Sequence, residues 1–165
     1  MTKRIDGKYV HKLEPGNVLL EDVRQRPGDP DWFEAEMVHD TEHPFFFEHP
    51  LDHIPAMMLV EAGRQMGIAV SHLFLGVPQG TMFATRAFDI RFSDFAELQT
   101  PVSIAGQVTD KQYHRGTLLH LRLDGYFSQG GRELGSMGGS WSMLRPEVWR
   151  RYRRREQARL AGHGG

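Results

Sequence analysis

The sequence predicts an α+β fold in which a curved antiparallel β-sheet wraps one long, buried helix. The first observation is a stretch, residues 55–75, that is apolar around nearly its whole helical circumference, and a helix of that kind is buried. The second is a series of later segments that alternate apolar and polar residues, as half-buried antiparallel strands do. The third is the length of 165 residues, which suits one domain with its own core.

The apolar stretch carries start and stop signals for a helix. Pro55 suits the first turn, and Asp52 or His53 is placed to cap the amides before it. Gly76 lies where the helix should end. About 20 residues also approaches the length of a membrane span, but the charged and polar residues inside the stretch argue against one.

Four polar side chains share one face of this helix. At about 100° per residue, an arc of roughly 100° contains Glu61, Arg64, Gln65 and His72. Glu61 and Arg64 are three residues apart, a spacing at which side chains meet. A buried carboxylate and guanidinium are unfavourable unless they are paired or used. The stripe is therefore either a structural ion pair or part of a site that lines a cleft or a dimer interface.

The remaining segments supply the sheet and one long loop. Before the helix, residues 9–20 predict one or two strands, and residues 32–39 predict another. Residues 41–53 form a loop crowded with histidine, acidic and phenylalanine side chains. After the helix, alternation predicts four strands, at 82–92, 102–108, 119–127 and 134–144.

Such a sheet covers the helix on every side only if it curls around it and something closes the remaining face. That architecture is the hotdog fold, in which a partner subunit commonly supplies the closure, so we expect a homodimer. We assign residues 1–144 to this single domain and residues 145–165 to a basic helix and tail.

The C-terminal segment 145–165 differs in composition from the rest of the chain. It contains seven arginines and two glutamates, and Pro146 fits a helix start. It is either a solvated helix or a docking surface for something acidic, such as a carrier protein or a phosphopantetheine arm. Nucleic acid is a weaker option, because few aromatic residues are interleaved with the charges.

Composition excludes several kinds of chemistry. The chain has no cysteine, so disulfides, thiolate nucleophiles and thiolate metal sites are excluded. The net charge of −1 gives no general nucleic-acid signal. The N-terminal segment lacks the apolar core of a signal peptide, which predicts a cytoplasmic protein. The histidines of the long loop match no familiar ligand motif, so no metal is expected.

Several motifs resemble the A-factor biosynthesis hotdog family across roughly residues 10–102. They are His43-Pro44-Phe45-Phe46, Asp52, the segment LVEAGRQ ending at Gln65, His72 and Val77-Pro78. The better-known members of that family carry two such repeats. They transfer a β-ketoacyl group from an acyl carrier protein to a three-carbon phosphorylated acceptor, making γ-butyrolactone signals in secondary metabolism.

The resemblance implies an acyltransferase that uses acyl carrier-protein or CoA thioesters. It implies no cofactor beyond the phosphopantetheine that carries the substrate. Because this chain shows one repeat, it also implies that two chains pair to rebuild the double unit.

A more distant resemblance is to β-hydroxyacyl carrier-protein dehydratases, whose pattern runs from a catalytic histidine to a catalytic glutamate. His49 matches that histidine and Glu61 that glutamate, although the interval is two residues shorter and Ala56 replaces a glycine. His53 is the other candidate for the base. A dehydratase or thioesterase on the same scaffold is therefore an alternative. A further alternative is a non-catalytic module that binds an acyl chain, a lactone or a carrier protein.

Thioester chemistry needs a polarised carbonyl and an acid or base. The N-terminus of the long helix, around Ala56 and Met57, offers backbone N–H groups to an oxyanion. Glu61 can act as general base if burial raises its pKa, and Arg64 either pairs with it or holds the substrate. The other candidates for substrate binding are Gln65, His72 and His43. His43, His49 and His53 are also candidates for proton transfer at the mouth of the site.

Overall fold

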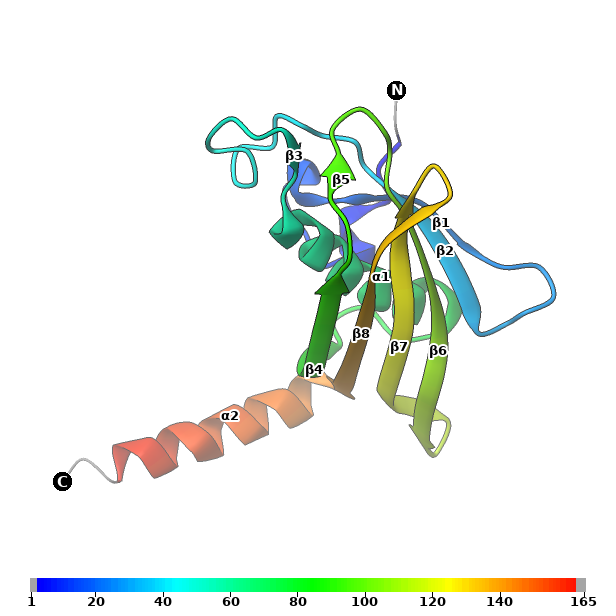
Figure 1. Ribbon diagram of the computed structural model, residues 1–165. Coiled ribbons are helices and arrows are strands. Elements are labelled where there is room, and N and C mark those ends of the chain that lie inside the picture. The colour runs from blue at the N-terminus through cyan, green and yellow to red at the C-terminus, as the bar shows by residue number, and fades with distance from the viewer. Residues whose placement is uncertain (1–2, 163–165) are drawn as a thin grey trace.

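The computed structural model describes residues 3–162 (Figure 1). Residues 1–2 and 163–165, which include the last three of the predicted tail, lie outside the described part. A six-stranded antiparallel sheet has the order β1-β2-β6-β7-β8-β4. Its strands are β1 (Leu20–Gln25), β2 (Trp32–Met37), β4 (Met82–Phe92), β6 (Ser103–His114), β7 (Thr117–Gln129) and β8 (Arg132–Leu144). The predicted α+β class is confirmed.

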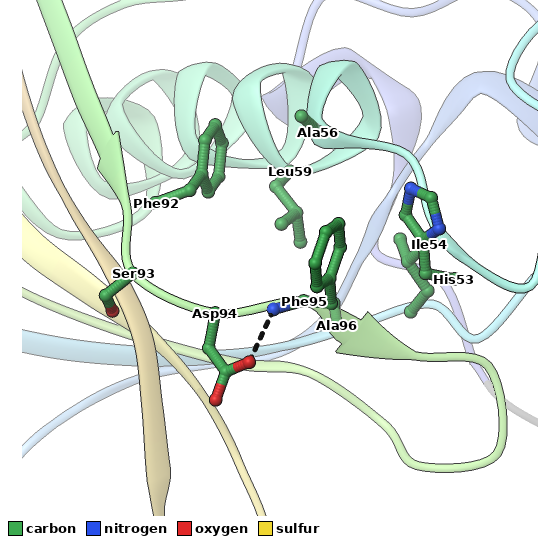
Figure 2. A pocket seen from close by; sticks show the side chains of 9 residues that line it. All are labelled: His53, Ile54, Ala56, Leu59, Phe92, Ser93, Asp94, Phe95 and Ala96. Carbon is green, nitrogen blue, oxygen red and sulfur yellow. Dashed lines mark hydrogen bonds between the residues drawn. The ribbon is translucent and has the colours of Figure 1, made fainter.

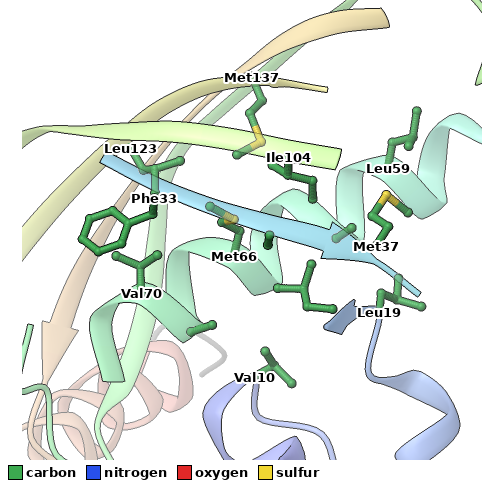
Figure 3. Packing of buried hydrophobic residues seen from close by; sticks show 14 of the residues in the cluster. Val10, Leu19, Phe33, Met37, Leu59, Met66, Val70, Ile104, Leu123 and Met137 are labelled. Carbon is green, nitrogen blue, oxygen red and sulfur yellow. The ribbon is translucent and has the colours of Figure 1, made fainter. Parts of the chain in front are cut away.

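The long helix α1 (Ala56–Phe74) lies across the sheet, as predicted. Its buried side includes Met66 and Val70, which pack among Phe33, Ile104 and Leu123 of the sheet (Figure 3). Burial of this large apolar surface is the main stabilising contribution to the domain. The face is less continuous than the sequence predicted, because Met57 near the start of the helix is 62% exposed.

Two glycines of α1 let the helix approach the sheet closely. A Cβ atom at Gly63 would lie 2.7 Å from the Met137 sulfur, and one at Gly67 would lie 2.5 Å from the Trp141 ring. Both partners come from β8. Larger side chains at these positions would push the helix away from the sheet, since a well-packed core does not absorb added volume cheaply.

The N-terminal segment corrects one prediction. Residues 9–20 form no strand of their own; they contain the end of the 3₁₀ turn η1 (Gly7–Tyr9) and all of η2 (Pro15–Asn17). Pro15 begins the second of these turns, and β1 starts only at Leu20. The buried Val10 and Leu19 of this segment cover the side of α1 away from the sheet (Figure 3).

The strands after the helix agree with the predicted pattern. β4 occupies the predicted residues, while β6 and β7 extend beyond theirs as a long hairpin. β8 pairs with β7 on one side and with β4 on the other, which leaves β4 at the edge of the sheet. A second, two-stranded sheet joins β3 (His53–Ile54), at the end of the long loop, to β5 (Ala96–Glu97).

Helix α2 (Pro146–Ala161) follows β8 directly and runs away from the domain (Figure 1). None of its described residues is buried. Among residues 3–162, no helix is long and apolar enough to cross a membrane.

Candidate functional site

Glu61 is the centre of a polar cluster on α1. Its carboxylate accepts two hydrogen bonds from Arg64, of 2.8 Å from Nε and 2.9 Å from Nη2. Lys12 Nζ lies 2.8 Å from Glu61 Oε1, and Gln65 Nε2 donates to the same oxygen at 2.9 Å. The structure thus brings together three of the four residues predicted on the polar stripe, and adds a lysine from the N-terminal segment.

Lys12 reaches this cluster because of the local backbone. His11 has a φ of 56°, an uncommon conformation for a residue with a side chain. The Lys12 N–H then donates to the Gly7 carbonyl at 2.9 Å. This tight turn directs the lysine side chain toward α1, whose Glu61 is 49 positions along the chain, so no helical or strand periodicity could reveal the pair.

Gln65 is a structural link between α1 and the N-terminal segment. It is fully buried, its Oε1 accepts from the Leu19 N–H at 2.9 Å, and its Nε2 donates to the Asn17 carbonyl at 2.8 Å. Without it, the buried Leu19 N–H would lose its acceptor. These contacts, with the bond to Glu61, use both N–H groups and the oxygen of the Gln65 amide. The substrate-binding role of Gln65 stays a prediction.

The hydrogen bonds to Glu61 settle the charge of its carboxyl. Burial acts to raise the pKa of Glu61, but the hydrogen bonds from its three donors outweigh burial and lower the pKa to about 2. The condition that we set for a general base, a pKa raised by burial, is therefore not met. Glu61 is a charged anchor at neutral pH, with two cations against its single negative charge.

A hollow of about 410 Å³ opens beside this cluster. Its lining includes Lys12, Glu61 and Met57 together with His43 and Phe46. His43 is buried, its Nε2 lies 3.2 Å from Asn17 Oδ1, and its Nδ1 accepts from the Phe45 N–H at 3.2 Å. With both ring nitrogens occupied, His43 shapes the hollow and is poorly placed to transfer a proton.

A second hollow, of about 320 Å³, lies at the N-terminus of α1 (Figure 2). Its walls come from the start of the helix, from His53 and Ile54, and from the segment that leads from β4 into β5. In Figure 2, Phe92, Leu59 and Phe95 surround the open space, and the His53 ring lies at its side. The lining is mostly apolar: His53, Ile54, Ala56, Leu59, Phe92, Ser93, Asp94, Phe95 and Ala96.

His53 is held in a defined orientation at this hollow. Its Nδ1 lies 2.7 Å from Asp52 Oδ1, and its ring meets the Phe95 ring edge-on with centroids 5.0 Å apart. The hydrogen bond from His53 lowers the pKa of Asp52. A carboxylate at Nδ1 selects the tautomer with its proton there, which leaves Nε2 as an acceptor. Among the described residues, none hydrogen-bonds to that Nε2.

The capping role predicted for Asp52 and His53 is wrong. The N-cap position is Pro55, and no described side chain caps the first turn of α1. Asp52 instead binds its neighbour His53. The N–H groups of Ala56 and Met57 lie in the uncapped first turn, at the positive end of the helix dipole. Ala56 lines the hollow at His53, and Met57 lines the hollow beside Glu61.

Two other predicted histidines lie apart from these hollows. His49 lines a different depression with Glu48 and Leu98. His72 shares the face of Glu61 by angle, but its Nδ1 binds the Val77 carbonyl at 2.8 Å and its Nε2 lies 2.9 Å from Nε2 of His11. His72 thus links the last turn of α1 to the segment that follows the helix. Among residues 3–162, no group of three His, Asp or Glu side chains is arranged to hold a metal ion.

The sequence profile of the A-factor biosynthesis hotdog domain matches residues 1–145 of this chain. The chain belongs to the A-factor biosynthesis hotdog family. One relative is the 2-oxo-3-(phosphooxy)propyl 3-oxoalkanoate synthase of Streptomyces virginiae, which is 34% identical over 96 residues. That match covers 56% of this chain and only 29% of the length of the synthase.

Solved structures with the same fold include a dehydratase and a hypothetical thioesterase. A dehydratase heterocomplex from Xenorhabdus doucetiae has a TM-score of 0.61 at 13% identity, covering 88% of this chain and 94% of that one. A hypothetical thioesterase with coenzyme A from Streptococcus pneumoniae has a TM-score of 0.52 at 11% identity, covering 74% and 84%. These likenesses confirm the hotdog fold of this A-factor family member.

Reasoning from sequence missed two features of this family member. Asp52 was assigned to capping, although an Asp-His dipeptide before a helix is also a signal for an oriented histidine. Phe95, which packs on the His53 ring, lies in a segment with no pattern of its own. The pairing of Ile54 with Ala96, the residue after Phe95, brings it to the hollow.

Proposed function

We propose that this chain transfers an acyl group from a pantetheine thioester to a hydroxyl acceptor, with His53 as the proton acceptor. The observation that carries the proposal is the Asp52–His53 pair beside the uncapped first turn of α1. An oriented imidazole with an available nitrogen and two backbone N–H groups are the two components that acyl transfer requires. The mostly apolar hollow at His53 suits the acyl and pantetheine portion of the substrate.

The reaction divides between these groups as follows. The thioester carbonyl oxygen points toward the N–H groups of Ala56 and Met57, which stabilise the negative charge that develops there. Nε2 of His53 takes the proton of the acceptor hydroxyl as its oxygen bonds to the carbonyl carbon. The C–S bond then breaks, and the leaving sulfur receives that proton from His53. One thioester and one alcohol become one ester and one thiol.

The acceptor belongs in the hollow beside Glu61. Lys12 lines that hollow with Glu61, and Arg64 adds a second positive charge to the same cluster. The net charge of +1 on these three side chains suits an acceptor that carries phosphate. The name of the Streptomyces virginiae relative describes a product with a phosphooxypropyl group, which supports a phosphorylated three-carbon acceptor.

Hydrolysis of the thioester is the second candidate. The His53 side chain is one-third exposed, so water can take the place of the acceptor hydroxyl. Dehydration is less well supported, because the pKa of about 2 keeps Glu61 ionised and its donors occupy the carboxylate. A dehydratase needs a carboxylic acid or its equivalent to protonate the departing hydroxyl.

We also propose that the chain acts as a homodimer joined along β4. The eleven residues of β4 pair with β8 on one side, and no strand of the described chain pairs with the other side. Met82 and Phe92 at its two ends are 38% and 43% exposed. An edge that is long and partly apolar is a template for a second strand. Sedimentation equilibrium should give twice the mass of the chain, and a monomer at micromolar concentration would contradict this assignment.

Intact-mass spectrometry of carrier-protein thioesters tests the reaction itself. Wild type and His53→Ala are incubated with β-ketoacyl carrier protein, with and without dihydroxyacetone phosphate as acceptor. Transfer predicts loss of the acyl mass that requires the acceptor and is absent from the variant. Loss of the acyl mass without acceptor would mean that the enzyme hydrolyses the thioester instead of transferring the acyl group. Loss that is equal in both proteins, or absent from both, would contradict the proposal.

A further inference from the structure

Helix α2 is the strongest unexplained feature of the molecule. It lies beyond residue 145, where the match to the A-factor family ends, so the family resemblance does not account for it. Six arginines lie within its sixteen residues. Of these, Arg150, Arg151, Arg154 and Arg155 form no ion pair with any residue from 3 to 162.

Helix α2 is poorly stabilised by its own contacts. It buries no residue, whereas most helices in proteins gain their stability from packing an apolar face against the rest of the fold. Arg150 and Arg154 are four positions apart, as are Arg151 and Arg155, and like charges at that spacing repel. Its internal support includes the stacking of Trp149 on Tyr152, the Arg153 guanidinium 5.8 Å from the centre of the Trp149 ring, and the ion pair between Arg159 and Glu156. A partner that carries negative charge would therefore stabilise this helix.

The topology shows where α2 would lie in the dimer proposed above. Leu144 pairs with Met82, so α2 leaves the domain at the Met82 end of β4. Figure 1 shows the helix running outward past the β4 edge. Two β4 strands related by a two-fold axis run antiparallel, which brings the Met82 end of one chain to the Phe92 end of the other. The α2 of each chain then begins beside the His53 hollow of its partner.

The lining of the His53 hollow lacks a cation that could bind the phosphate of a pantetheine arm. Its nine lining residues include His53 and Asp94 but neither lysine nor arginine. Arg132, just outside the lining, is paired with Asp94 and also donates to the Phe95 carbonyl. A pantetheine thioester carries a phosphate at the far end of its arm, so its carrier brings negative charge to the mouth of this hollow.

We propose that α2 of one subunit is the docking element for an acidic carrier protein whose phosphopantetheine arm enters the His53 hollow of the other subunit. The helix is about 24 Å long, and its arginines spread over several faces. This suits the extended acidic surface of a protein domain better than the compact phosphates of CoA. The inference rests on the proposed function for the identity of the arm, and on the β4 dimer for the trans arrangement.

Binding measurements test the docking role without requiring turnover. Fluorescence anisotropy of a labelled, phosphopantetheinylated carrier protein is compared for wild type and for Arg150→Gln/Arg154→Gln. A matched control, Lys8→Gln/Arg115→Gln, removes two exposed cations elsewhere. We expect the Kd to rise at least about fivefold in the α2 variant only, with a weaker dependence on salt. An unchanged Kd would overturn the proposal, as would a loss confined to CoA or to a DNA oligonucleotide.

Mixed dimers test whether α2 acts in trans. Ala56→Trp fills the His53 hollow and keeps α2, whereas Arg150→Gln/Arg154→Gln keeps the hollow and weakens α2. Co-expression of the two chains should restore tight arm binding to about a quarter of all sites, because half of the dimers are hybrids with one complete site. If α2 serves its own chain, no tight sites reappear. If the carrier protein still binds through α2 but no turnover is found, the proposed function is contradicted and the docking role is not.

Discussion

Two polar groups flank the first turns of α1, and they differ in how completely their hydrogen bonds are satisfied. The Glu61 carboxylate accepts from Arg64, Lys12 and Gln65 and is held as an anion. His53 has one nitrogen bound to Asp52 and the other available beside a hollow. A group whose hydrogen-bonding positions are all occupied stabilises and positions its neighbours. A group with one nitrogen that is not hydrogen-bonded can exchange a proton. The comparison supports a structural role for Glu61 and the proton-transfer role that we propose for His53.

The largest expected effect is on the chemical side of this comparison. His53→Ala should lower kcat by about 10²- to 10⁴-fold, the usual contribution of a positioned acid or base. His49→Ala is the matched control, because His49 lines a separate depression, and it should retain kcat. Steady-state rates with a carrier-protein thioester measure both. Equal losses of kcat in the two variants would contradict a catalytic role specific to His53.

On the structural side, Gln65→Leu should destabilise the fold by about 2–4 kcal/mol, because the buried Leu19 N–H loses its acceptor. Urea denaturation gives the free energy of unfolding. Gln25→Leu, which removes one exposed hydrogen bond to the Pro30 carbonyl, should change it by less than about 0.5 kcal/mol. If the Gln65→Leu protein had normal stability but no activity, Gln65 would have to bind substrate instead of supporting the fold.

The charge of Glu61 predicts how stability depends on pH. Its pKa is about 2 in the folded chain, below the ordinary value of 4.5. Its contribution, at most about 3 kcal/mol, is therefore complete above about pH 4.5 and is lost as the pH falls toward 2. Denaturation at pH 3 to 6 should show a steeper acid loss for wild type than for Glu61→Gln. Parallel curves would mean that the carboxylate is not held by its donors.

The smallest expected effect concerns Asp52, the hydrogen-bond partner of the His53 ring. Asp52→Asn should lower kcat by about tenfold, because the Asp52 carboxylate is 98% exposed and water screens its charge. Asp94→Asn alters another acid of the same hollow and should leave kcat near that of wild type. If Asp52→Asn matched His53→Ala, a partner subunit would have to bury the pair.

The periodicity of the sequence predicted the helix, the later strands and the Glu61–Arg64–Gln65 group, because each depends on residues close in the chain. It could not predict Lys12, which reaches Glu61 through the turn at His11. It placed His72 on the correct face but could not show that the Val77 carbonyl takes its Nδ1. The early strand failed because turns at Pro15 and before Tyr9 satisfy that backbone instead.

The pKa of Glu61 shows most clearly what a pattern leaves out. Burial of a carboxyl is visible in the sequence as an apolar context, and burial alone raises a pKa. The number of donors around the carboxylate is a property of tertiary structure, and here the donors reverse the direction of the shift. The sequence therefore predicted that Glu61, Arg64 and Gln65 lie together, but not the direction in which the pKa of Glu61 is shifted.

Single-turnover rates of His53→Gln and Glu61→Gln, measured side by side on folded protein, test the central assignment most directly. Both substitutions keep a polar side chain, and neither supplies an effective base. We predict a loss of at least about 100-fold for His53→Gln and less than about tenfold for Glu61→Gln. The reverse order would contradict the assignment and return the general base to Glu61.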